Sequence, residues 1–238
     1  MFNKWEDLSM ELVRKRSAYG VYGGLALLLF GCLAISFANM DFSEAAMRSR
    51  VRIASRVALF YFILTFWAGP LWKVWKNDFS KYLFQNRRYL GISAAFAQTI
   101  FILLVSWTYS NIPRPLDEIL TLREMVIGYS GMATYWILGL TSNDASVKFF
   151  GKKWAIIHMV GLYYLWYIYI NSYAPGLHRN PEYIVPLAFL AGGFALRMYL
   201  QFQKIDKVAP LRRQVVLSSI VGVVCVWMSA VIYTGQSI

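Results

Sequence analysis

The stretch AYGVYGGLALLLFGCLAISF, residues 18–37, decides the fold class of this chain. It contains no charged side chain, and a helix of this length crosses the roughly 30 Å of hydrocarbon in a bilayer. Further apolar runs follow along the 238 residues, of which 58% are hydrophobic and only 15% are charged. We therefore predict an all-α integral membrane protein, a helical bundle of about seven transmembrane helices. The predicted spans are residues 18–37, 53–72, 90–107, 126–141, 154–172, 183–202 and 215–233.

The second and sixth spans each contain one arginine near an end. Spans 53–72 and 183–202 reach membrane length only by including Arg56 and Arg197. A long arginine stem can lie along the apolar helix while its guanidinium reaches the lipid headgroups. Both spans therefore stay in the prediction.

Basic residues gather in alternate connections, and this pattern predicts the orientation. The basic connections are the N-terminal segment and residues 73–88, 148–153 and 204–213. Because cytoplasmic connections carry the excess of Lys and Arg, we predict a cytoplasmic N-terminus and a periplasmic C-terminus. Arg48, Arg50 and Arg52 lie on the opposite side, and we interpret them as an interfacial helix that leads into the second span. Orientation accounts for the net charge of +12, so we expect no nucleic-acid partner.

The charge pattern also predicts the domain organisation. We expect residues 1–17 to form an N-terminal cytoplasmic amphipathic segment and residues 18–238 to form a single transmembrane bundle. Residues 73–86 mix aromatic side chains with cations, which is typical of a helix lying on anionic lipid. A docking surface for a soluble partner is the alternative. The residues that we expect to contact lipid or a partner are Trp75, Lys76, Arg87 and Arg88.

The predicted spans contain no aspartate or glutamate, because all 12 carboxylates fall in connections or in the N-terminal segment. Proton relays and ion-coupled transporters usually require ionisable groups inside the membrane. The motifs of serine hydrolases, zinc proteases and P-loop enzymes are also missing from the sequence. We therefore predict no catalytic residue. Cys32 and Cys225 lie in distant apolar runs, which favours neither a disulfide nor a metal site.

His158 and His178 are the only histidines and hence the only conventional haem or metal ligands. His158 lies about one turn inside the fifth span and His178 lies beyond its far end, so about 20 Å or more separates them. One iron cannot bind both. For His158 we expect a structural role, with the ring hydrogen-bonded between helices; ligation of one haem with Met132 or Met159 is the alternative. Mid-span aromatic residues could also pack against a quinone.

Four short motifs, in order, resemble the ferric-reductase-like transmembrane domain. The similarity is greatest to the haem-binding membrane subunit of the bacterial methionine-sulfoxide reductase system. The motifs are AGPLW (68–72), RRYLGI (87–92), LTSND with FGKK (140–144 and 150–153) and WAIIH (154–158). The resemblance covers residues 57–173 and implies a ferric-reductase-like core in the bacterial cytoplasmic, or inner, membrane.

The resemblance also implies haem ligands that this chain lacks. Where the family has a ligating histidine in the third span, this chain has Phe101, and where a further histidine would follow, it has Asn171. Of that ligand set only His158 is present. We therefore expect a degenerate haem site, with no cofactor bound.

These observations predict a non-catalytic accessory or scaffold subunit of a membrane complex. Its partners would be membrane lipids and membrane-protein subunits. The alternative is an electron-transfer protein, a membrane oxidoreductase subunit, that carries one haem b at His158 between a cytoplasmic flavin or quinone and a periplasmic acceptor. A lipid- or quinone-binding protein is a third possibility.

Overall fold

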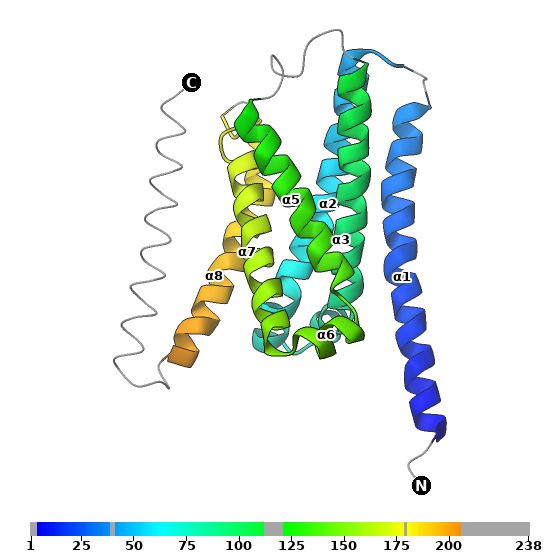
Figure 1. Cartoon of the computed structure of the whole chain (residues 1–238), viewed down its shortest axis with the longest axis vertical. Helices are drawn as coiled ribbons and strands as arrows, with labels where there is room; N and C mark the ends of the chain where they lie inside the picture. Colours follow the sequence, from blue (N-terminus) through cyan, green and yellow to red (C-terminus); the bar gives the residue numbers. More distant parts are fainter. Residues whose placement is uncertain (1–3, 39–40, 112–120, 179, 206–238) are drawn as a thin grey trace. The chain divides into compact units, whose positions relative to one another are not determined.

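The computed structural model describes residues 4–38, 41–111, 121–178 and 180–205, and every regular element in them is a helix (Figure 1). The all-α prediction is therefore confirmed for this part of the chain. The helices are α1 (Lys4–Phe37), α2 (Glu44–Val74), α3 (Asp78–Ser110), α5 (Leu122–Leu140), α6 (Asp144–Phe150), α7 (Lys152–Tyr173), the 3₁₀ helix η1 (Pro181–Tyr183) and α8 (Ile184–Ile205).

Four helical stretches are long and apolar enough to cross a membrane: Tyr19–Phe37, Glu44–Val74, Asp78–Ser110 and Pro181–Gln203. They correspond to the first, second, third and sixth predicted spans. The chain is therefore a helical membrane protein. Residues 4–17 of the predicted N-terminal segment continue into the first of these stretches as part of α1.

The predicted count of seven spans is not confirmed. The fourth and fifth predicted spans form α5 and α7, but neither helix is among the four stretches of membrane-spanning character. Both helices contain Tyr and Trp and have charged residues in the first turn, which lower the mean hydropathy of a helix. The predicted span 215–233 lies outside the described residues.

Polar side chains mark where the helices begin. In each case a side-chain oxygen accepts a hydrogen bond from a backbone N–H of the first turn, which has no partner within the helix. In α3 and α5 the third helical residue returns a bond to the cap, so that a capping box closes. The capping residues are Ser43 for α2, Asn77 for α3, Thr121 for α5 and Asn143 for α6.

The described chain divides into two compact units within α7, the first ending at Leu165 and the second beginning at Trp166. In the first unit, α2 and α3 run side by side in opposite directions (Figure 1). Alanines on both helices are buried, which permits close backbone approach: Ala54, Ala58, Ala94 and Ala97. Along α1, the residues at four-residue intervals from Val21 to Leu33 are buried, whereas Leu27 on another face is 79% exposed.

Arg50 joins three helices of the first unit, although only 1% of it is exposed. Its Nε and Nη2 donate to the backbone carbonyl of Ser36 at 3.3 and 3.0 Å. This carbonyl lies in the last turn of α1, where helix carbonyls lack intrahelical donors and a positive charge is favoured. The guanidinium carbon lies 3.9 Å from the ring centroid of Phe37, and that ring lies 6.2 Å from Trp107 of α3. Arg50, a residue of α2, therefore caps the C-terminal end of α1.

The three arginines of this cluster differ in their surroundings, and their interfacial interpretation stays a prediction. Arg50 is buried in the first unit, where its guanidinium binds the end of α1. Arg48 forms an ion pair with Glu44 at 2.7 Å, and Arg52 is exposed. Nearby, hydrogen bonds from the backbone N–H and then the hydroxyl of Ser43 hold the pKa of Asp41 below its ordinary value.

The second unit is held by aromatic side chains at the end of α7. Trp166 donates from Nε1 to the backbone carbonyl of Leu190 in α8 at 2.9 Å. Its ring also stacks on Phe194, with 4.4 Å between centroids. Near the other end of α8, Tyr173 packs edge-on against Tyr183 at 4.9 Å. These contacts fix α8 against the last turns of α7.

We expect Arg50→Lys to lower the free energy of unfolding by about 1–2 kcal/mol, because an ammonium group cannot replace two guanidinium donors or lie flat on Phe37. Thermal unfolding of the purified protein in detergent measures this. Arg52→Lys makes the same chemical change at an exposed position and should change stability by less than about 0.5 kcal/mol. Equal effects of the two substitutions would contradict the role assigned to Arg50.

Candidate functional site: the seam between α5 and α7

His158 lies in the second turn of α7 and contacts the end of α5. Its Nε2 lies 2.9 Å from Oγ1 of Thr141, the residue that follows α5. Its ring stacks on Trp154, with centroids 4.1 Å apart and an interplanar angle of 29°. Trp154 in turn donates from Nε1 to the backbone carbonyl of Thr141 at 2.8 Å. Thr141, Trp154 and His158 thus form one closed group of contacts.

The protons of this group indicate which tautomer His158 adopts. Oγ1 of Thr141 lies 2.5 Å from the backbone carbonyl oxygen of Ile137, a distance that requires a proton between the two oxygens. A hydroxyl has a single proton, so Thr141 donates to Ile137 and can only accept from His158. We infer from this network that Nε2 of His158 carries its proton and donates. In that tautomer Nε2 has no lone pair for iron.

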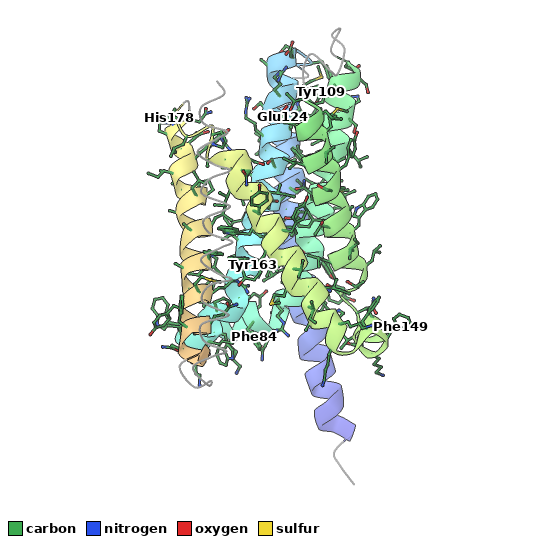
Figure 2. All side chains as sticks on the ribbon, turned by 60° about the vertical axis from the view of Figure 1, so that its left-hand side comes forward. Phe84, Tyr109, Glu124, Phe149, Tyr163 and His178 are labelled. Atoms are coloured by element: carbon green, nitrogen blue, oxygen red, sulfur yellow. The ribbon has the colours of Figure 1, made fainter. Side chains whose placement is uncertain are left out.

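Further contacts continue the seam along both helices. The hydroxyls of Ser130 in α5 and Tyr164 in α7 lie 2.7 Å apart. At Gly161 of α7, an added Cβ would lie 2.9 Å from Cδ2 of Leu138, so the leucine side chain of α5 occupies the space next to this glycine. Tyr163, labelled in Figure 2, packs edge-on against Phe66 of α2 at 6.2 Å. The seam therefore combines polar contacts with side-chain packing.

The short helix α6 lies between Thr141 and His158 in the chain. Asn143 caps α6 by accepting from the backbone N–H of Ser146 at 2.7 Å. Gly151 ends α6 with a φ of +52°, a conformation that side chains with a Cβ rarely adopt. The chain reverses at this glycine and enters α7, which brings Trp154 and His158 back to the end of α5.

The other predicted ligand positions have separate surroundings. Phe101 is half-buried in α3 of the first unit. Asn171 belongs to the second unit, where its Nδ2 donates to the carbonyl of Tyr167 one turn earlier in α7 at 2.8 Å. His178 also belongs to the second unit and is exposed after the end of α7. Of the methionines considered as axial ligands, Met132 is buried in α5 and Met159 is exposed on α7.

Among the described residues, no three His, Cys, Asp or Glu side chains come together as a metal site requires. Cys32 is a free, partly buried thiol in α1. Cys225 lies outside the described residues.

The four predicted lipid- or partner-contact residues have different environments. Trp75 and Lys76 follow the end of α2 and are exposed. Arg87 is exposed, and its guanidinium carbon lies 4.6 Å above the ring of Phe84. Arg88 instead forms an ion pair with Asp144 of α6 at 2.6 Å. The two neighbouring arginines therefore have distinct roles, which the sequence did not distinguish.

Sequence reasoning missed Thr141 as the partner of His158 and missed α6 as a helix. The signals were present: Asn143 is a favourable cap, Asp144 suits a first turn, and Gly151 is a favourable stop.

Comparisons with family models, with curated proteins and with solved structures find no match to this chain. The ferric-reductase-like resemblance accordingly stays a prediction.

A double-mutant cycle with Thr141→Val and His158→Phe should give a coupling energy of about 0.5–1 kcal/mol, the usual strength of a hydrogen bond between membrane helices. Unfolding free energies in detergent supply the four values. A matched cycle pairing Thr141→Val with Ser172→Ala, which bonds only to its own helix at Ile168, should give no coupling. A zero value for the first cycle would mean that the contact contributes nothing.

Proposed function

We propose that this chain is a non-catalytic accessory or scaffold subunit of a membrane complex. In this proposal a ferric-reductase-like bundle of seven spans lies in the bacterial inner membrane, with the N-terminus cytoplasmic and the haem sites lost. The bundle would contribute helix faces to partner subunits rather than carry electrons.

One observation carries the proposal: the Nε2 atom of His158 is engaged by Thr141 at 2.9 Å while its ring is stacked on Trp154. Both contacts lie within the first unit, which supports a structural role for His158. Phe101 and Asn171, at the two other ligand positions implied by the resemblance, cannot bind haem iron as histidine does. In this proposal the three implied ligand positions serve packing and hydrogen bonding instead of haem.

Absorbance spectroscopy tests the loss of haem. The protein purified from haem-supplemented cells should show no Soret band and no pyridine-haemochrome signal, because in this proposal His158 serves the contact with Thr141 and the other two implied ligand positions hold Phe101 and Asn171. A stoichiometric b-type spectrum that His158→Ala abolishes and Asn171→Ala preserves would overturn the proposal in favour of electron transfer through one haem.

Co-purification tests the scaffold role. Extraction in mild detergent followed by mass spectrometry should recover a defined set of membrane-protein partners, since a subunit without chemistry of its own acts through its contacts. An unrelated tagged membrane protein of similar size provides the background set. Recovery of the chain only as a free monomer would contradict the scaffold role.

A further inference from the structure

The connection between α2 and α3 presents aromatic side chains to the outside. We call residues 75–82 the α2–α3 corner. Trp75 is 66% exposed, and Phe79 and Tyr82 are exposed as well. Ser80 is buried and its hydroxyl bonds to the backbone carbonyl of Trp75, while Asn77 caps α3. The corner is therefore an ordered turn that projects its aromatic rings.

The helix α6 presents a similar surface at the same end of the first unit. Phe149 is 81% exposed, and Figure 2 shows it projecting outward at the end of the unit where Phe84 lies. The ion pair between Arg88 and Asp144 attaches the start of α6 to α3. Two segments far apart in sequence thus expose large apolar side chains at one end of the helices.

Positive charge surrounds these apolar side chains. Within residues 73–87 and 144–153 the exposed acidic residues are Asp78 and Asp144, and Asp144 already pairs with Arg88. The exposed cations outnumber them: Lys73, Lys76, Lys81, Arg87, Lys148, Lys152 and Lys153. The guanidinium of Arg87 lies over the ring of Phe84, which stacks in turn on Trp72. Within the described residues Arg87 has no carboxylate partner.

We propose that the α2–α3 corner and α6 form a binding face for anionic phospholipids of the adjacent leaflet, with Arg87 as the main phosphate donor. Both α2 and α3 are long and apolar enough to span the membrane, so the corner that joins them lies at the bilayer surface. Aromatic rings prefer the headgroup boundary, and cations there attract anionic lipid. This inference does not depend on the scaffold role.

An acidic soluble protein fits these observations less well than lipid does. Such a partner would satisfy the cations, but Trp75, Phe79 and Phe149 would have to be covered by a separate apolar surface. One membrane leaflet offers both kinds of contact: its acyl chains would cover the apolar side chains, and its phosphates would pair with the cations. Arg88 is already held by Asp144, so we expect it to organise the face rather than to bind phosphate.

Native mass spectrometry of the full chain in detergent tests this proposal. Titration with phosphatidylglycerol and with phosphatidylcholine of the same acyl chains should show preferential retention of phosphatidylglycerol. Arg87→Gln should weaken that retention about fivefold, the effect of one surface cation. Arg52→Gln removes the same charge from an exposed site near the opposite end of α2 and should weaken it less than about twofold.

A thermal-stability assay gives a second readout that needs no variant. Phosphatidylglycerol should raise the unfolding temperature of the unaltered protein, and phosphatidylcholine should not, because only a ligand that binds the folded state stabilises it. Equal retention of the two lipids, or equal losses for Arg87→Gln and Arg52→Gln, would overturn the proposal. So would binding of polyglutamate in preference to phosphatidylglycerol, which would assign the face to an acidic protein.

Discussion

Polar groups within long apolar helices must find partners inside the protein, because hydrocarbon offers no water to replace them. This constraint explains the most specific contacts of the first unit. Trp136 of α5 donates to Thr99 of α3 at 3.1 Å, and Ser130 contacts Tyr164 of α7 at 2.7 Å. Arg50 satisfies the end of α1 in the same manner. These polar contacts between helices therefore also specify which helices are neighbours.

The fold could be predicted where the sequence is uniformly apolar and less well where it is mixed. The run 18–37 and the long helices α2, α3 and α8 have the membrane-spanning character expected of them. In α5 and α7 the helices form, and their Tyr, Trp, Ser and Thr residues make hydrogen bonds between helices. Hydropathy along one segment cannot reveal such contacts, because the partner lies in another segment.

The same reasoning explains what could be predicted of the candidate site. His158 was recognisable as a residue with either a structural or a ligand role, and the sequence left both open. Its contact with Thr141 depends on the reversal at Gly151 after α6, which short-range patterns did not reveal. Charge patterning predicts an interfacial role for Arg50 together with its neighbours, but it cannot show that one arginine of the three caps another helix.

The account depends most on the proton at Nε2 of His158, which the hydrogen bond to Thr141 requires. Nitrogen-15 NMR of the labelled histidine ring in detergent measures the protonation of each ring nitrogen directly, with Thr141→Val as the comparison. We expect the spectrum of a neutral ring protonated at Nε2, with exchange protection that is lost in Thr141→Val. A ring protonated only at Nδ1, or a shift characteristic of iron coordination, would contradict the account.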